Sequence, residues 1–360
     1  GIAGGGVGGL AAALALQQRG ADVVVFERAR RQHQGIALLV WANAIQALAA
    51  LGVADGLLAR AARLDRTEVR GASGAVLSDL PIGAWSKLPS VALFRRDLLA
   101  ALAAPLGDVV REAELAGFEA GDGVTLRFAS GRDERVDALI GADGLGSIVR
   151  AQLLGAEPPR ALQQQAWVGW VALPSVAGVA TATIGRGPRF WHAPLAGGTF
   201  WYATVNHVGG DRDALLAALA GWHEPIGALI RATRDEDLIA TQIRDRAPVA
   251  RWGEGAVTLL GDAAHASTPD LGQGACQALE SAAVLGASFE REASIEAALR
   301  AYERARIERT ATISRLCWMT SVNSTIESPL LCTLRDTAIK AGLKSVARGH
   351  LEWILAGQPW

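Results

Sequence analysis

The spacing of apolar residues divides the chain into two kinds of segment. Residues 10–20, LAAALALQQRG, are helix formers that end in a glycine, and residues 21–28, ADVVVFER, form a β-branched run. This order predicts a helix followed by a buried strand. Between residues 166 and 243 apolar and polar positions alternate, as in AWVGWVAL and GTFWYATVN, which predicts an antiparallel sheet with one buried face. From residue 295 the spacing is again helical, and we expect the Arg/Glu face of AYERARIERTATISRLC (301–317) to be exposed.

A glycine cluster, GGGVGGL, precedes the first predicted helix. Gly4, Gly6 and Gly9 have the spacing Gly-x-Gly-x-x-Gly, and Glu27 ends the strand that follows the helix. The glycines permit a tight turn, close approach of the backbone to a pyrophosphate and close helix packing, and the helix N-terminus attracts phosphate. Glu27 suits ribose hydroxyls. The cluster therefore predicts a dinucleotide site, and because few residues precede it we expect the chain to begin inside its first strand.

Two later segments have the same order of strand, turn and helix. In ERVDALIGADGLGSIVR (134–150) a strand over 136–140 leads to a turn with Asp143 and a short helix. In GAVTLLGDAAHASTPDLGQGACQALESAAVLG (255–286) a buried strand ends at Asp262, and the sequence GQG opens a long helix. Such a helix directs its positive dipole end and free N–H groups at what lies before it. Alone, the first of these segments is equally consistent with an ordinary strand–turn–helix unit.

Together, these three segments resemble the class A flavoprotein monooxygenases, the para-hydroxybenzoate hydroxylase-like superfamily. They match its FAD fingerprint, its DG motif and its GD motif in order, and ALFRRDLLAAL (92–102) resembles its Arg-x-Asp-Leu helix start. The likeness covers nearly the whole chain and points to the compact branch with zeaxanthin epoxidase-like and urate hydroxylase-like enzymes. It implies the following FAD-binding residues: Gly4, Gly6, Gly9, Glu27, Arg28, Arg95, Asp143, Asp262, Gly272, Gly274 and Ala275.

Some positions depart from the family pattern. Ser281 stands where the family usually has Asp, so we expect a weaker contact from that helix. Thr268 and Asp270 flank Pro269 where many members have Pro-Pro-Asn, which concerns the substrate more than FAD. His265 in GDAAH is expected to be structural, and because the six histidines show no metal-ligand spacing we expect no metal.

The fold class implied by the patterns and the resemblance is α/β, with an α+β substrate part. We expect a Rossmann-type FAD-binding domain (1–72, 92–165 and 250–310) interleaved with an antiparallel-sheet substrate domain (73–91 and 166–249) and followed by a C-terminal helical segment (311–360). The amphipathic end of that segment is more typical of packing between domains than of membrane contact. Six tryptophans between residues 167 and 252 suggest an apolar cavity suited to aromatic groups, although a core explains each one alone.

Composition narrows the function. The 35 basic and 36 acidic residues give a net charge of −1, which provides no electrostatic footprint for nucleic acid or an anionic membrane. No apolar run reaches the length of about 18 residues that a membrane span needs. Three cysteines without metal spacing fit a reducing compartment. We therefore expect a cytoplasmic protein, monomeric or homodimeric, without nucleic-acid or membrane partners.

The resemblance implies an FAD-dependent monooxygenase of secondary metabolism. NADH or NADPH is expected as a transient co-substrate, because FAD takes the single dinucleotide fingerprint. A flavin C4a-hydroperoxide then transfers one oxygen atom from O2 to a small aromatic or hydrophobic substrate by hydroxylation, epoxidation or Baeyer–Villiger insertion. Two alternatives stay open: a flavin oxidase or dehydrogenase of the same fold, and a non-catalytic flavin-binding redox sensor.

Asp270 and Arg189 are the candidate catalytic residues. By resemblance, Asp270 lies in the loop over the flavin, where urate hydroxylase-like members have Thr-Pro-Asp, and it is placed to take a substrate proton. Arg189, in GPRFWHAPL of the predicted sheet, is placed to hold an anionic substrate. The alternatives are that Asp270 caps the loop before the helix and that Arg189 is a solvated strand residue.

Overall fold

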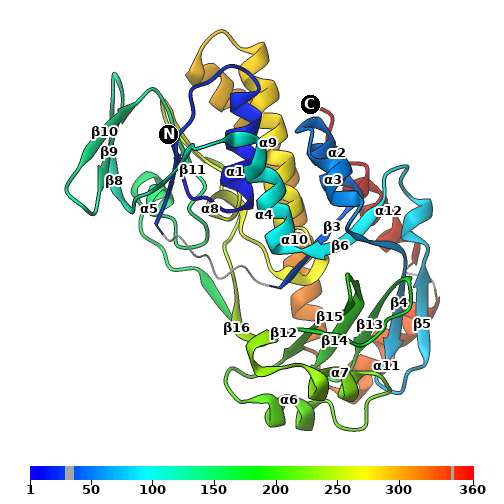
Figure 1. Ribbon diagram of the computed structural model, residues 1–360. Coiled ribbons are helices and arrows are strands. Elements are labelled where there is room, and N and C mark those ends of the chain that lie inside the picture. The colour runs from blue at the N-terminus through cyan, green and yellow to red at the C-terminus, as the bar shows by residue number, and fades with distance from the viewer. Residues whose placement is uncertain (29–35, 342–343) are drawn as a thin grey trace.

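Five short parallel strands form the first sheet of the computed structural model, which describes residues 1–28, 36–341 and 344–360 (Figure 1). The strand order is β17-β11-β1-β2-β7, and every neighbouring pair is parallel. The bounds are β1 (Ile2–Ala3), β2 (Val25–Glu27), β7 (Val110–Glu112), β11 (Leu139–Gly141) and β17 (Val257–Leu259). The interior strands are buried, as a parallel sheet covered on both faces requires. The predicted Rossmann-type part is confirmed.

Small residues let two helices approach each other closely beside this sheet. Helix α1 (Val7–Gln17) packs against α9 (Gly274–Arg291), which also packs against α10 (Ile295–Ser324). A Cβ built at Gly286 of α9 would lie 3.0 Å from the Cβ of Ala15 in α1. A Cβ built at Gly8 would lie 2.7 Å from Leu260. Glycine at both positions therefore sets how near α1 lies to its neighbours.

The prediction that the Arg/Glu face of residues 301–317 is exposed is wrong. Glu303, Arg306 and Arg309 are buried, while Arg304 and Glu308 are exposed. The residues three apart share one face of α10, and this face packs against α9. Each of these buried charges has a partner of opposite charge: Glu303 pairs with Arg300, and Arg306 and Arg309 pair with Glu280. A charged helix face can therefore be buried here.

The remaining helices join the sheets or cover them. Their bounds are α2 (Ala42–Ala50), α3 (Ala54–Leu58), α4 (Arg95–Ala103), α5 (Ile148–Leu154), α6 (Arg212–Ala218), α7 (Ile226–Ala232), α8 (Asp262–His265), α11 (Pro329–Ala341) and α12 (Lys344–Leu355), with 3₁₀ turns η1 (Ile82–Ala84), η2 (Ala104–Leu106), η3 (Asp235–Asp237) and η4 (Pro269–Leu271). Helix α12 contacts α2 and α11 contacts β5, so the C-terminal segment touches both halves of the molecule. Within the described ranges, no helix combines the length and the apolar composition needed to cross a bilayer.

A three-stranded antiparallel sheet follows the order β10-β9-β8. Its strands are β8 (Leu115–Gly121), β9 (Gly123–Phe128) and β10 (Asp133–Val136). The single strand predicted over 136–140 is wrong, because β10 ends at Val136 and β11 begins at Leu139 in the parallel sheet. The chain leaves one sheet and enters the other at this point, so the apolar run is shared between two ladders.

The largest sheet follows the order β16-β12-β15-β14-β13-β4-β6-β3, with β5 paired to β4. Its strands are β3 (Ala37–Val40), β4 (Ala62–Gly71), β5 (Val76–Leu80), β6 (Ser90–Phe94), β12 (Arg160–Val171), β13 (Gly178–Ile184), β14 (Arg189–Leu195), β15 (Gly198–Val205) and β16 (Leu238–Asp245). Most pairs are antiparallel as expected, but β13 and β4 pair in parallel. Strands β3 and β4, inside the first predicted FAD-binding range (1–72), are hydrogen bonded into this sheet. The division into domains stays a prediction.

The two faces of this sheet have different neighbours. Trp167 and Trp201 pack with α6 and α7 on one face, whereas Trp170 and Trp191 lie in an apolar cluster with β3 and β6 residues. Trp252 belongs to the core of the parallel-sheet part. The tryptophans therefore do not form the single aromatic cavity that their number suggested, because alternate residues of a strand point to opposite faces.

Replacing Gly169 with alanine tests the packing of the sheet. Gly169 of β12 pairs directly with Trp201 of β15, and a Cβ at Gly169 would lie 2.4 Å from the indole of Trp201. Because the indole is buried and donates to Thr233 Oγ1 at 2.8 Å, we expect Gly169→Ala to lower the free energy of unfolding by about 1–3 kcal/mol. Urea unfolding measures this.

Gly71→Ala is the matched control, since no described atom lies within 4 Å of a Cβ built at this strand glycine. We expect it to change stability by no more than about 0.5 kcal/mol. Equal stability of the two variants would contradict the packing described here.

Candidate functional site

The turn between β1 and α1 uses its three motif glycines for different reasons. Gly4 has φ +101°, and a Cβ there would lie 2.4 Å from the carbonyl oxygen of Ala142. A Cβ at Gly9 would lie 1.8 Å from the carbonyl oxygen of Gly4. No described atom lies within 4 Å of a Cβ built at Gly6, which precedes α1 without a side-chain cap. The fold requires Gly4 and Gly9, and Gly6 leaves open space at the helix N-terminus, which favours an anion.

Glu27 ends β2 beside this turn. Its Oε2 accepts a hydrogen bond from the backbone N–H of Gly5 at 2.7 Å, which holds the carboxylate at the start of α1. Arg28 follows it and is exposed. The structure places Glu27 with the glycine turn, as the motif predicts.

In the second motif, only one of the two carboxylate oxygens of Asp143 has a hydrogen-bond partner among the described residues. Asp143 Oδ2 accepts hydrogen bonds from the N–H groups of Ile148 and Val149 at the start of α5, at 2.8 and 3.3 Å. Its Oδ1 is buried and has no partner among the described residues. Arg150, in the same helix, donates to the carbonyl of Ala263 at 3.0 Å, which ties this turn to the third motif.

Asp262 and Arg95 come from separate motifs and are close enough for each charge to affect the other. Asp262 begins α8 and Arg95 begins α4. Burial raises the pKa of Asp262, and the charge of Arg95 opposes this shift; burial lowers the pKa of Arg95, and Asp262 opposes that shift. The Asp262 residue as a whole is nevertheless exposed to solvent. Arg95 Nε is buried without a partner in the described part of the chain.

Two glycines, Gly272 and Gly274, lie at the start of α9. Gly272 has φ +61°, and a Cβ there would lie 2.9 Å from the indole nitrogen of Trp41. No described atom lies within 4 Å of a Cβ built at Gly274, and Ala275 is half-buried. The first turn of α9 carries no acidic residue. Its positive dipole end is therefore offered to an acceptor or an anion.

Asp270 and Arg189 form a buried ion pair between η4 and the large sheet. The Asp270 side chain has 0% exposure and that of Arg189 has 14%. Arg189 Nε also donates to Thr204 Oγ1 at 3.1 Å, while Arg189 Nη2 and Asp270 Oδ2 have no partner among the described residues. Arg189 is thus not a solvated strand residue, and no cap hydrogen bond from Asp270 to η4 or α9 occurs among the described residues.

Tyr202 joins this pair, and the sequence reasoning missed it. Burial raises the pKa of its hydroxyl, Arg189 lowers it and Asp270 raises it further. The hydroxyl is buried without a partner in the described ranges. In the register Arg189 is opposite Thr204 and Trp191 is opposite Tyr202, so Tyr202 is a diagonal neighbour of Arg189 on one face. The alternation in GTFWYATV indicates which residues share a face with Tyr202. Its nearness to Arg189 follows only once the pairing of β15 with β14 is known.

His265 is enclosed in the protein. Burial and then the charge of Arg306 lower its pKa to about 3, so it is neutral at physiological pH. Its Nε2 lies 3.2 Å from Ser281 Oγ, and its ring packs 5.4 Å from that of Trp252. Within the described residues no group of His, Cys, Asp and Glu is arranged to hold a metal ion.

Comparison with known proteins gives one family. The family described as FAD binding domain matches residues 1–182. An aurachin C monooxygenase/isomerase of Stigmatella aurantiaca is 37% identical over 326 residues, 86% of this chain and 85% of that protein. An FAD-dependent urate hydroxylase of Klebsiella pneumoniae subsp. pneumoniae is 35% identical over 334 residues, again 86% and 85%. The crystal structure of Klebsiella pneumoniae HpxO complexed with FAD and uric acid superposes with a TM-score of 0.92 at 30% identity, over 99% of this chain and 97% of that chain.

A methyl group at Gly6 tests the proposed phosphate position. The backbone of Gly6 (φ −75°) suits alanine, and the new Cβ meets no described atom. We therefore expect Gly6→Ala to fold normally and to bind FAD at least about tenfold more weakly, because the methyl group fills the space beside the helix N-terminus. Titration of the apoprotein with FAD measures the loss.

Gly56→Ala in α3, which also meets no described atom, is the control and should bind FAD as the parent does. Unchanged affinity in Gly6→Ala would show that the phosphates lie elsewhere.

Proposed function

Since this chain belongs to the FAD-dependent class A flavin monooxygenases, as its motifs indicated, we propose that it uses NADH or NADPH and O2 to insert one oxygen atom into a small aromatic or hydrophobic compound. The observation that carries this is the buried pair of Asp270 and Arg189, which joins η4, just before the start of α9, to the sheet face with Tyr202. FAD supplies the oxygenating species, a flavin C4a-hydroperoxide, when it is loaded and reduced.

The FAD-binding residues of the proposal come from four helix starts, those of α1, α4, α8 and α9, and from two strand ends, those of β2 and β11. Gly6 and the first turn of α1 hold the pyrophosphate, Glu27 holds a ribose, and Arg95 with Asp262 holds the ribityl and phosphate region. The unpartnered Oδ1 of Asp143 and Nε of Arg95 fit a ligand with hydroxyl and phosphate groups. The full set is Gly4, Gly6, Gly9, Glu27, Arg28, Arg95, Asp143, Asp262, Gly272, Gly274 and Ala275.

Asp270 and Arg189 act on the substrate in this proposal. Asp270 Oδ2 accepts a proton from an O–H or N–H of the substrate, and Arg189 stabilises the anion that results. An electron-rich anion attacks an electrophilic oxygen more readily than the neutral compound does. Tyr202, on the same sheet face as Arg189, donates a hydrogen bond from its hydroxyl to the same anion.

The substrate class follows from the neighbours of this pair. Trp191, Phe200 and Trp170 share the apolar cluster that contains Tyr202, so the site suits a flat, apolar-sided compound with one acidic O–H or N–H. The two relatives are named for different compounds, aurachin C and urate. The identity of the compound is therefore taken from the site's chemistry rather than from either relative.

Isotope labelling tests the proposed function. Purified protein is loaded with FAD and supplied with NADH or NADPH, ¹⁸O₂ and a panel of flat phenols and N-heteroaromatic lactams. We expect substrate-stimulated NAD(P)H oxidation and one ¹⁸O atom in the product. Substrate oxidation without ¹⁸O would indicate an oxidase or dehydrogenase, and no substrate response across the panel would favour a binding protein.

Asp270→Asn tests the proposed base. The variant keeps the size of the side chain but removes its charge, so it is expected to bind FAD and to lose product formation by about 10²-fold or more. NAD(P)H oxidation should then yield hydrogen peroxide, which is measured beside product.

Asp245→Asn is the matched control, because Asp245 is also fully buried in an arginine pair, with Arg160. We expect its oxygenation to stay coupled. Full coupled turnover in Asp270→Asn would give Asp270 a structural role alone.

A further inference from the structure

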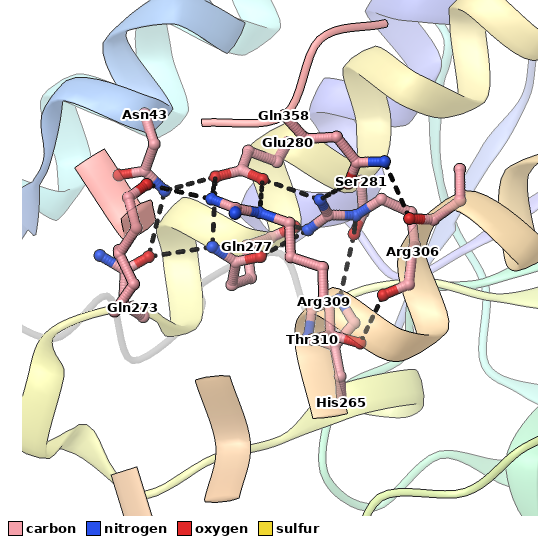
Figure 2. Close-up of polar contacts among 12 residues, drawn as sticks. Asn43, His265, Gln273, Gln277, Glu280, Ser281, Arg306, Arg309, Thr310 and Gln358 are labelled. Carbon is pink, nitrogen blue, oxygen red and sulfur yellow. Dashed lines mark hydrogen bonds and ion pairs between the residues drawn. The ribbon is translucent and has the colours of Figure 1, made fainter. Parts of the chain in front are cut away.

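Two arginines of α10 surround one carboxylate of α9 (Figure 2). Arg306 Nη1 donates to Glu280 Oε2 at 2.7 Å, and Arg309 Nε donates to the same oxygen at 2.9 Å. The side chains of Glu280, Arg306 and Arg309 have 0%, 0% and 7% exposure. Burial opposes ionisation of Glu280, but Arg306 and Arg309 outweigh it and hold its pKa below the ordinary value. We call these three residues the charge cluster.

The charge cluster is not neutral. It holds two guanidinium groups and one carboxylate, and the polar side chains that bond to it carry no charge. Ser281 accepts from Arg306 Nε at 3.1 Å, and His265 beside it is neutral because burial and Arg306 lower its pKa to about 3. Among the described residues, the other side chains that hydrogen bond to the cluster are the amides of Asn43, Gln277 and Gln358.

Part of the excess charge is offset at the C-terminal end of α12. Arg309 donates to the carbonyl oxygens of Ile354 and Trp353, at 3.0 and 3.5 Å, where the helix dipole is negative. The remaining positive charge lies beside the first turn of α9, where Arg306 donates to Gln277 Oε1. Glu280 lies six residues after Gly274, about 9 Å along the helix at 1.5 Å per residue. The excess positive charge therefore adds to the positive dipole end of α9.

We propose that the charge cluster is an electrostatic element of the flavin site. Because Ser281 carries no charge, one of the two guanidinium charges stays uncompensated and provides a buried positive charge near the start of α9. This charge favours the anionic reduced form of FAD over the oxidised form. The inference rests on the proposed position of the flavin ring at the start of α9. At an effective dielectric constant of about 20, one unit charge about 12 Å away changes such an equilibrium about tenfold.

A series of charge changes tests this through the midpoint potential of bound FAD, measured by spectroelectrochemistry at pH 8. Ser281→Asp adds a carboxylate beside Arg306, and Arg309→Met removes one cation, so both should weaken the preference for reduced FAD about tenfold, a fall of about 30 mV for two electrons. Glu280→Gln removes the anion and should shift the potential upward. The opposite shifts in midpoint potential distinguish an effect of charge from structural damage. Damage to the contact between the helices would not change the direction of the shift according to the charge that was removed or added.

Gln277→Met is the matched control, since it removes hydrogen bonds to Gln273, Glu280 and Arg306 without changing charge. It should leave the potential close to that of the parent. At pH 8 the neutral His265 does not gain a proton that would compensate Ser281→Asp. If Glu280→Gln fails to fold, the other two variants decide. An unchanged potential in both, or loss of FAD binding in both while Gln277→Met retains it, would overturn the proposal. The measurement needs no NAD(P)H, O2 or substrate, so a failure of oxygenation does not affect it.

Discussion

The turn that precedes α1 leaves no room for side chains, and the positions of the cofactor-binding elements follow from that. With the Cβ of Gly9 excluded by the carbonyl of Gly4 and that of Gly8 excluded by Leu260, α1 lies directly on the sheet and on α9. Both helices follow parallel strands, α1 after β1 and α9 after β17, so their N-termini lie at the carboxyl edge of one sheet. Two positive helix ends are thereby available to one ligand, one beside Gly6 and one beside Gly274. A side chain at Gly8 or Gly9 would move the first helix and separate the two ends.

The two faces of the large sheet pack against different parts of the molecule. Alternation along β14 and β15 sends Phe190 and Trp201 toward α6 and α7, and sends Arg189 and Tyr202 to the opposite side. The pair of Arg189 with Asp270 then joins this sheet to the loop before α9. Since both charges are buried, the pair holds the two parts in one arrangement, and breaking it by removing one partner leaves an uncompensated charge. The two side chains that join these parts are therefore the same ones to which we assign the substrate proton.

Local signals in the sequence were sufficient for the elements that carry FAD, and insufficient where distant segments meet. The glycine turn and the turn with Asp143 depend on residues close in sequence, and their order and spacing predicted them, whereas the helix start at Arg95 came from the family resemblance. The capping of α5 by Asp143 was not predicted. The division of the 136–140 strand, the parallel pairing of β13 with β4 and the position of Tyr202 depend on which strands become neighbours. No single-strand pattern contains that information. The charged face of α10 was misjudged for the same reason, because Glu280, which pairs with it, lies more than twenty residues away.

Two sets of buried polar groups in this protein differ in whether their atoms have partners inside the protein. Arg95 Nε, Asp143 Oδ1, Arg189 Nη2 and Asp270 Oδ2 have no partner within the described residues. Each such group costs about 1–3 kcal/mol, a large part of the stability of about 5–15 kcal/mol that a folded domain has. A ligand that satisfied these four atoms, as we propose, would remove this cost and so link binding to folding. The charge cluster is the reverse case, since its carboxylate and both guanidinium groups are hydrogen bonded inside the protein. Its polar atoms have partners within the protein, so the contribution that we propose for it is an electric field that acts at a distance rather than a contact with a ligand.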